Sequence, residues 1–406
     1  MCRIFGIKAM DEFKRHLSAR LKSYLQLFPC VAIVGPRQVG KTHLVKALMG
    51  QYEREAIYLD LESDEDLARL SNAEQYLNAR QDKLIIIDEV QRKPELFVLL
   101  RSVIDKRREN GRFILLGSAS PELLTQSSES LAGRIGYLEM HPFSNEEVKE
   151  VFSPDDLWLR GGFPNALIQR DASLSMEVRQ QFIQTYVERE LAILGLSASA
   201  LRLKNLLRMI AHMQGQLINY SQLSNSMGIN VQTLHRYLDF FEHAFIIRRL
   251  EPYHVNVQKR IVKSPKVYIR DTGVYHALAG IEDREALDGF HGKGPSWESF
   301  VLQQVMQRLK PGVDMHFYRT HDGTELDAVL LKGMTPVLGL EVKLSNAPSI
   351  TRGTTIASAD LGDVPVLVVT HSAEEDYAHN ERVTVTSFER LFQHLAQKKM
   401  IEAALT

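Results

Sequence analysis

The pattern of hydrophobic and polar positions changes along the chain, and its first part alternates between two periods. Short apolar runs predict strands buried on both faces of a sheet, and apolar residues spaced three and four apart between these runs predict helices. This alternation is typical of a parallel α/β sheet covered by helices. The predicted strands cover residues 31–34, 56–61, 84–87, 112–116 and 136–140, and the clearest helix covers residues 94–110.

The second part of the chain, after Pro142, has mainly helical periodicity. Helices are predicted over 178–194 and 200–213. A short helix, a turn at 228–230, a longer helix and a strand follow, which together match a winged helix-turn-helix. Asn230 is the expected N-cap of the longer helix. The predicted inward stripe of that helix consists of Leu234, Tyr237, Leu238 and Phe241.

The first predicted strand leads into a glycine-rich loop, Gly35-Pro-Arg-Gln-Val-Gly40-Lys41-Thr42, and then a helix. This is the phosphate-binding pattern G-x-x-x-x-G-K-[ST] in the context that it requires. The glycines let backbone N–H groups face phosphate oxygens, Lys41 adds a charge, and Thr42 offers a hydroxyl to Mg²⁺. The residues expected to bind ATP or ADP in this loop are Gly35, Pro36, Arg37, Gln38, Val39, Gly40, Lys41, Thr42 and His43.

A second nucleotide motif ends the apolar run 84–87 with Asp88 and Glu89. The carboxyl ends of neighbouring parallel strands open into one cleft, so Asp88 is expected to face Thr42 and hold Mg²⁺ with it. Glu89, one residue on, is expected to polarise the attacking water. The alternative is an ordinary buried strand with a solvated acidic end.

Two further polar residues are candidates for the phosphate chemistry. Ser118 ends the next strand and is expected to face the γ-phosphate; the alternative is a helix N-cap at Ser120, and both can hold. Arg134 precedes the last strand and is expected to stabilise charge on the transferring phosphoryl group, often that of a neighbouring subunit. A structural ion pair is the equally weighted alternative for Arg134. Action in trans would require an oligomer.

The last part of the chain, from about residue 295, predicts a helix, three strands, a helix and a strand. Acidic residues stand at the ends of these elements, in a spacing that resembles the PD-(D/E)xK nuclease core. Glu298, Asp327 and Glu341 are the expected ligands of a divalent cation, and Lys343 would orient the attacking water. The alternative is a surface ion pair between Glu341 and Lys343. A binding module without cleavage also remains open.

Charge and composition narrow the classes of function. The chain has 406 residues, is 44% hydrophobic and carries a net charge of −1, which supports two or three domains and excludes a generally basic protein. One local stretch, 248–270, is nevertheless basic and predicts DNA contact together with the winged helix, where Gln232, Thr233, His235 and Arg236 could face bases. A lid or a protein-binding surface is the alternative. The cations of the stretch are Arg248, Arg249, Lys259, Arg260, Lys263, Lys266 and Arg270.

The motifs in this order, with LAGRI at 131–135 and WLRGGFPNA at 158–166, resemble a family of prokaryotic AAA+ ATPases with a C-terminal domain of unknown function. The resemblance implies an AAA+ sheet with strand order 5-1-4-3-2 and, if Arg134 acts in trans, a hexamer. It also implies that Gly161, Gly162 and Pro164 match a G-G-x-P element near the adenine in related signalling and defence ATPases. The expected parts are an ATPase core at 1–145, a helical lid at 146–195, a winged helix at 196–285 and a nuclease-like domain at 286–406.

These patterns predict an Mg²⁺-dependent ATPase that couples turnover to DNA binding or processing, with nuclease activity as one version. The alternative is a nucleotide-dependent switch that binds a protein partner and has an inert C-terminal domain. A small-molecule kinase is a third option, with no obvious substrate pocket. No apolar run reaches about 18 residues, and the N-terminus is too polar for a secretory signal, so no membrane association and a cytoplasmic location are expected.

Overall fold

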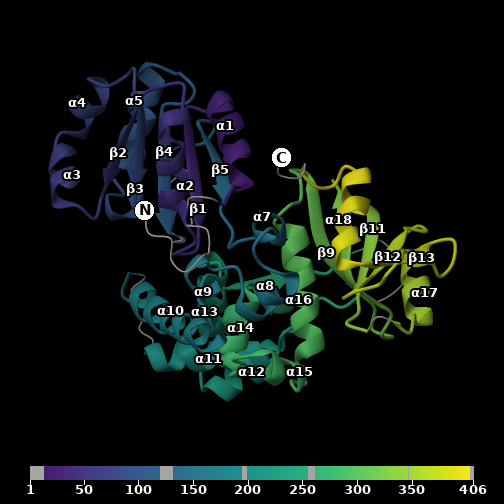
Figure 1. The fold of residues 1–406 in the computed structure, drawn as a ribbon. Helices are drawn as coiled ribbons and strands as arrows, with labels where there is room; N and C mark the ends of the chain where they lie inside the picture. The colour runs from purple at the N-terminus through teal and green to yellow at the C-terminus, as the bar shows by residue number, and fades with distance from the viewer. Residues whose placement is uncertain (1–12, 119–130, 194–198, 255–260, 346, 403–406) are drawn as a thin grey trace.

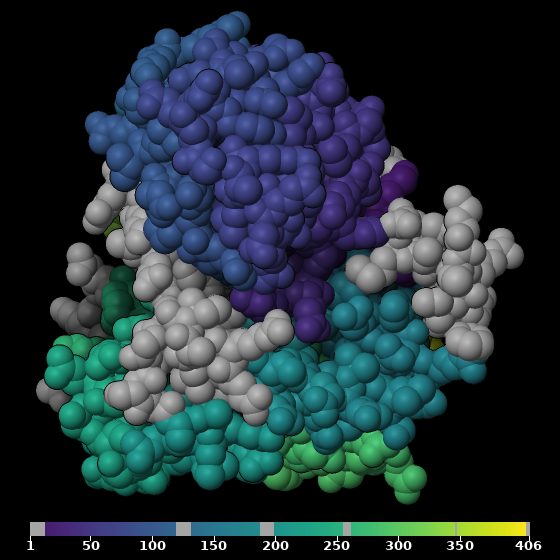
Figure 2. All heavy atoms as spheres, turned by 90° about the vertical axis from the view of Figure 1, so that its left-hand side faces the viewer, coloured from purple at the N-terminus to yellow at the C-terminus, as the bar shows by residue number. Residues whose placement is uncertain are grey.

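The computed structural model of the chain describes residues 13–118, 131–193, 199–254, 261–345 and 347–402. Figure 1 shows three groups of elements: a purple and blue α/β core, a teal helical region and a green to yellow α/β region. Figure 2, turned by 90°, shows the α/β core (purple and blue) above the helical region (teal). None of the helices in the described ranges combines the length and apolar character needed to cross a lipid bilayer.

The first group is a five-stranded parallel sheet in the order β2-β3-β4-β1-β5, which confirms the predicted order 5-1-4-3-2. The apolar strands are packed between helices on both faces, as runs without polar alternation require. Because β1 lies inside the sheet, the loop that follows it opens between its neighbours. The strands are β1 (Cys30–Gly35), β2 (Ala56–Asp60), β3 (Leu84–Asp88), β4 (Phe113–Ser118) and β5 (Ile135–Glu139), and the helices α1 (Leu17–Leu27), α2 (Lys41–Leu48), α3 (Asp64–Arg69), α4 (Ala73–Asn78) and α5 (Leu96–Lys106).

The helical region also has elements where the sequence predicts them. Asn230 accepts a hydrogen bond from the Thr233 N–H at 2.7 Å, and the four stripe residues of the helix that it caps are buried, so cap and stripe are both confirmed. Three short strands form a sheet in the order β6-β8-β7. The helices are α7 (Asn145–Val148), α8 (Pro154–Arg160), α9 (Pro164–Leu167), α10 (Ala172–Ile193), α11 (Ala200–His212), α12 (Tyr220–Met227), α13 (Val231–His243), α14 (Thr272–Ala279) and α15 (Arg284–Asp288), and the strands β6 (Gln216–Leu217), β7 (Ile247–Leu250) and β8 (Lys266–Ile269).

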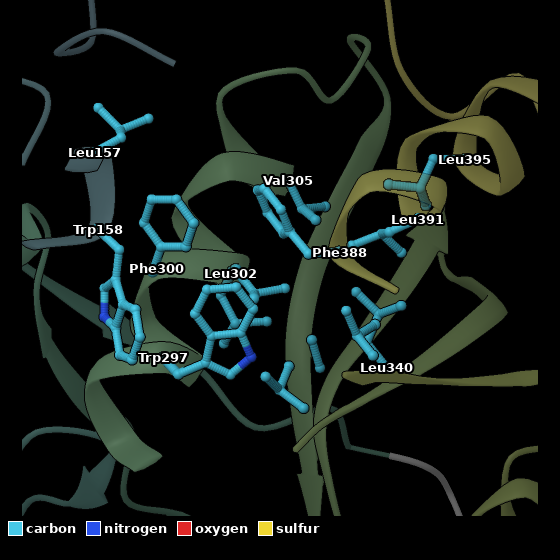
Figure 3. Packing of buried hydrophobic residues seen from close by; sticks show 14 of the residues in the cluster. Leu157, Trp158, Trp297, Phe300, Leu302, Val305, Leu340, Phe388, Leu391 and Leu395 are labelled. Carbon is cyan, nitrogen blue, oxygen red and sulfur yellow. The ribbon is translucent and has the colours of Figure 1, made fainter. Parts of the chain in front are cut away.

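The third group is a six-stranded mixed sheet in the order β13-β14-β12-β11-β10-β9. The sequence analysis missed its last strands and last helix. Aromatic and aliphatic side chains of α16 and α18 cover one face, where Trp297, Phe300 and Phe388 lie close to Leu340 of β11 (Figure 3). The elements are α16 (Lys293–Met306), β9 (Val313–Arg319), β10 (Glu325–Lys332), β11 (Thr335–Val342), α17 (Arg352–Asp360), β12 (Val366–Thr370), β13 (Tyr377–Ala378), β14 (Val383–Ser387) and α18 (Phe388–Gln397).

The helical and C-terminal regions share one hydrophobic core and are also joined by backbone hydrogen bonds. Trp158 of α8 packs edge-on against Trp297 of α16, with ring centroids 5.0 Å apart. The chain after β7 runs along the edge strand β9, where the Tyr253 N–H donates to the Phe317 carbonyl at 2.7 Å. The segment after residue 260 does the same, because the Val262 N–H donates to the Arg319 carbonyl at 3.1 Å. The described residues on both sides of 255–260 are therefore attached to the third group.

Candidate active site

The phosphate loop has the backbone that its glycines predict. At Gly35 a Cβ atom would lie 2.3 Å from the Met140 carbonyl oxygen, so no side chain fits there. Gly40 has φ +98° at the N-cap of α2, a left-handed conformation that other residues rarely adopt. The buried Lys41 donates from Nζ to the carbonyl oxygens of Gly35 and Pro36, both at 2.9 Å. The ammonium thus lies within the curve of the loop.

Residues outside the motif support the middle of this loop. The guanidinium of Arg15 donates to the Val39 carbonyl at 3.2 Å and pairs with Glu147 at 3.1 Å. Val39 itself is buried beneath the loop, and Gln38 has φ +60°. Sequence analysis missed Arg15, because nothing in its neighbourhood marks a contact with a residue 24 positions away.

Asp88, the expected metal ligand, faces Thr42 as the motifs predict. Thr42 Oγ1 donates to Asp88 Oδ2 at 2.6 Å, so the hydroxyl and carboxylate expected to hold Mg²⁺ are in contact. The phenol of Tyr58, on β2, donates to the same oxygen at 2.6 Å. Burial, and then the hydrogen bond to Asp88, raise the pKa of Tyr58, so the phenol remains a donor. The donor set fits Mg²⁺, which accepts hydroxyl and carboxylate oxygens alongside phosphate.

The predicted base Glu89 belongs to a small polar network. Its backbone is left-handed, with φ +52°. Ser118 Oγ donates to Glu89 Oε2 at 3.1 Å. Gln91 Nε2 donates to the same carboxylate and to Ser118 Oγ, the latter at 3.0 Å. The structure therefore brings Ser118 and Glu89 together, with Gln91 in contact with both. The alternative for this strand end, a helix N-cap at Ser120, lies outside the described residues.

The glycine pair after α8 is held by Asp271. The Gly162 N–H donates to Asp271 Oδ2 at 2.7 Å. Gly162 also lines a small pocket together with Pro36, Phe163 and Arg270. The expected position of Gly162 beside a nucleotide base stays a prediction. Pro164 does not line that pocket: it is buried as the first residue of α9, a position that suits its fixed φ.

Arg134 lies at the opposite edge of the sheet from the phosphate loop. It immediately precedes β5, and the loop follows the carboxyl end of β1, which is parallel to β5. Its guanidinium forms two hydrogen bonds to Asp105, at 2.6 and 2.9 Å. The structural ion pair is thus present, and Arg134 takes no part in the nucleotide site of its own chain. Its role in a neighbouring subunit stays a prediction.

The acidic residues of the third group do come together, but around a lysine. Lys266 Nζ, on β8, lies 2.6 Å from Glu325, 3.4 Å from Glu298 and 3.5 Å from Asp327. Burial, and then the charge of Asp327, raise the pKa of Glu298 to about 7.

Glu341 Oε1 pairs instead with Lys343 at 2.6 Å, as the alternative for these two residues predicts. Across the described ranges, no three His, Cys, Asp or Glu side chains form a group that could hold a metal ion. Lys266 thus shares the carboxylates of Glu298 and Asp327, and Lys343 pairs with Glu341, while the role of these three acids as metal ligands stays a prediction.

Most of the cations that the structure describes in the stretch 248–270 form contacts inside the protein. The prediction of an exposed basic patch there is therefore corrected. Arg249 bonds to Glu242 at 2.7 Å and Asp239 at 2.6 Å. Arg270 pairs with Glu139 of the α/β core. Burial, with the nearby charge of Arg270, lowers the pKa of Arg248 to about 9. Lys263 is exposed, and Lys259 and Arg260 lie outside the described residues.

Comparisons with known proteins agree with this arrangement. An AAA domain model matches residues 28–149, and two domains of unknown function match residues 152–285 (DUF8612) and 293–391 (DUF4143). A solved Walker-type ATPase of Pyrococcus abyssi is 19% identical, with a TM-score of 0.48, over 67% of this chain and 97% of that chain.

Sequence relatives that extend beyond a single domain are also found. Uncharacterized proteins of Mycobacterium tuberculosis and Mycobacterium bovis are each 38% identical over 387 residues, covering 95% of this chain and 86% of theirs. An uncharacterized protein of Haemophilus influenzae is 25% identical over 280 residues, covering 61% of this chain and 68% of its own length. The chain therefore belongs to the same family as the mycobacterial proteins, and it carries an AAA domain and the domain of unknown function DUF4143.

Proposed function

We propose that this chain hydrolyses ATP with Mg²⁺ and uses the bound nucleotide to change the packing of its ATPase core on the rest of the chain. One observation supports the hydrolysis of ATP most directly. The Thr42–Asp88 contact of 2.6 Å lies next to the Glu89 carboxylate, which accepts a hydrogen bond from Ser118. A hydroxyl, a metal-binding acid and a candidate base at adjacent strand ends are what hydrolysis of a phosphoanhydride needs.

Each group then has one task. Backbone N–H groups of 35–42 hold the phosphates, and Lys41 places its charge beside the β- and γ-phosphates. Thr42 and Asp88 hold Mg²⁺, which when bound neutralises charge on the phosphate oxygens. Glu89 orients and polarises the attacking water, and Ser118 faces the γ-phosphate.

The second half of the proposal is supported by the pocket beside the loop. Its wall combines Pro36 of the phosphate loop, Gly162 and Arg270 of the helical region, and Gln303 of α16. Arg270 also pairs with Glu139 at the end of β5. A ligand that enters this pocket contacts all three groups of elements, so its binding energy can favour one packing over another.

Turnover and binding measurements on single variants test the ATPase. Glu89→Gln is expected to keep ATP affinity in calorimetry and to lower turnover by about 10²-fold or more, because the amide cannot accept the proton of water. Lys41→Ala is expected to lose ATP binding. Glu95→Gln, at an exposed acid six residues on, is the matched control and should behave as the wild type. Equal turnover by Glu89→Gln and the wild type would refute the proposal.

DNA contact through α13 is a second candidate function. Gln232 and Arg236, two residues expected to face bases, are exposed, whereas His235 stacks on Tyr220 with ring centroids 4.3 Å apart. Duplex DNA should then raise ATP turnover in a strongly salt-dependent manner. Arg236→Ala should reduce this effect, and Arg202→Ala, at an exposed arginine of α11, should not. No response to DNA would favour a switch that acts on a protein partner. The predicted nuclease activity has no support in the geometry of the acidic residues.

A further inference from the structure

The acid cluster, defined as Glu298, Glu325, Asp327 and Glu341, is centred on a lysine from another sheet. The side chain of Lys266 is 2% exposed, and its Nζ faces three of these carboxylates at 2.6 to 3.5 Å. It also lies 5.5 Å from the centre of the Phe317 ring. An ammonium has three N–H donors and no acceptor, so three carboxylate partners use its whole bonding capacity.

The oxygens of the cluster are already engaged with other donors. Glu298 Oε1 accepts from the Tyr268 phenol at 2.6 Å, and Asp327 Oδ2 accepts from the Val342 N–H at 2.8 Å. Glu341 Oε1 pairs with Lys343. A divalent ion needs several oxygens directed at one point about 2.0 to 2.6 Å away. Here one oxygen each of Glu298, Glu325 and Asp327 faces the Lys266 ammonium, so the point where these oxygens converge is already occupied.

The balance of charges also argues against a divalent ion in the acid cluster. Four carboxyl groups face three cations, which are Lys266, Lys343 and Arg319, the last at 3.1 Å from Glu325. A divalent ion added to this set would lie beside a buried ammonium, and two like charges at that distance repel strongly where water is excluded. One feature favours an added ligand: Glu341 Oε2 is buried without a hydrogen-bond partner among the described residues.

We propose that the acid cluster is an internal ion-pair site for the Lys266 ammonium, which takes the place of a divalent cation and locks the β6-β8-β7 sheet to the C-terminal sheet. The backbone hydrogen bonds between the chain after β7 and β9 join the same two regions and support the lock. The inference is independent of the ATPase proposal, because it concerns neither the phosphate loop nor its neighbours.

Lysine acetylation of the full, nucleotide-free chain, followed by mass spectrometry, tests the occupant of the cluster. Lys266 should react at least about tenfold more slowly than Lys263, the exposed lysine three residues before it, since the buried amine reacts only after local opening. Millimolar Mn²⁺ should not change this ratio. If Mn²⁺ makes Lys266 as reactive as Lys263, and Asp327→Asn abolishes that effect, a metal takes the site and the proposal fails. Equal reactivity without metal would also overturn it.

Thermal unfolding gives a second, activity-free readout. Lys266→Met keeps most of the length of the side chain and removes its charge, so the buried carboxylates lose their partner and the melting temperature should fall by about 5 °C or more. Mn²⁺ should restore part of this loss in Lys266→Met and none in Lys266→Met combined with Asp327→Asn. The nucleotide-free wild type should not respond to Mn²⁺. A wild type stabilised by Mn²⁺ as much as Lys266→Met would refute the proposal, and the acetylation result stands even if Lys266→Met does not fold.

Discussion

The phenol of Tyr58 lies 2.6 Å from Asp88 Oδ2, the oxygen that also faces Thr42. Neither nucleotide motif contains Tyr58. It reaches Asp88 because β2 and β3 are parallel neighbours and Asp60 pairs in register with Asp88, which places residues near the end of β2 beside the metal aspartate. The position of the carboxylate that is expected to hold Mg²⁺ therefore depends on three strands or helices at once.

Tyr58→Phe should lower ATP turnover by about tenfold while leaving the fold intact. The change removes one hydrogen bond to a charged carboxylate, worth about 1.5 to 3 kcal/mol, and leaves Asp88 free to rotate away from Thr42. Steady-state turnover at varied Mg²⁺ measures the effect. Tyr52→Phe is the control, since the hydroxyl of Tyr52 has only a 3.5 Å contact with the Val45 carbonyl. Identical turnover for both variants would argue against this role of Tyr58.

Gln91→Leu should reduce the rate of hydrolysis more than the affinity for ATP. Gln91 Nε2 bonds to both Glu89 and Ser118, so its loss leaves the candidate base without one of the two donors that orient it. We expect kcat to fall by about tenfold with little change in KM. Gln75→Leu, on the exposed face of α4, provides the comparison. A rise in KM at constant kcat would indicate a role in binding instead.

Gly161→Ala should destabilise the chain far more than Gly228→Ala. Both glycines have left-handed φ, +76° and +61°, so both substitutions carry a backbone cost of about 1 kcal/mol. Only at Gly161 would the added Cβ lie 2.1 Å from Asp271 Oδ1; Gly228 has open space. The expected loss in the free energy of unfolding is about 3 kcal/mol or more at Gly161. Chemical denaturation of the two variants would show equal losses if Asp271 could simply move aside.

His276 should make folding sensitive to acid. Burial lowers its pKa from 6.5 to about 4, and its two ring nitrogens contact the Leu159 carbonyl and Ser296 Oγ. Between these two pKa values the unfolded chain binds more protons than the folded one. Stability is therefore present above pH 6.5 and is lost as the pH falls toward 4, by about 3 kcal/mol.

His276→Gln, which does not titrate, tests this dependence. The free energy of unfolding of the variant should change less with pH over this window than that of the wild type. His379→Gln, at an exposed histidine, should reproduce the wild-type curve. A variant with the wild-type slope would assign the acid sensitivity to other groups.

The sequence by itself determined the parallel sheet, the phosphate loop and the Asp88–Glu89 strand end. These depend on neighbours in the chain: apolar runs, two glycines that the loop geometry requires, and residues at the ends of parallel strands. The Asn230 cap is local in the same way, since donor and acceptor are three residues apart.

Only the tertiary structure determined which charged side chains are paired inside the protein and which are exposed. Counting cations along 248–270 predicts an exposed basic patch, but Arg270 pairs with Glu139 across 131 positions and Lys266 with Glu298 across 32. The same holds for Tyr58 and Asp88, 30 positions apart. Local patterns encode backbone shape and which face is buried, because these depend on adjacent residues. The partner of a buried charge depends on which distant segments the fold brings together, and no local pattern contains that information.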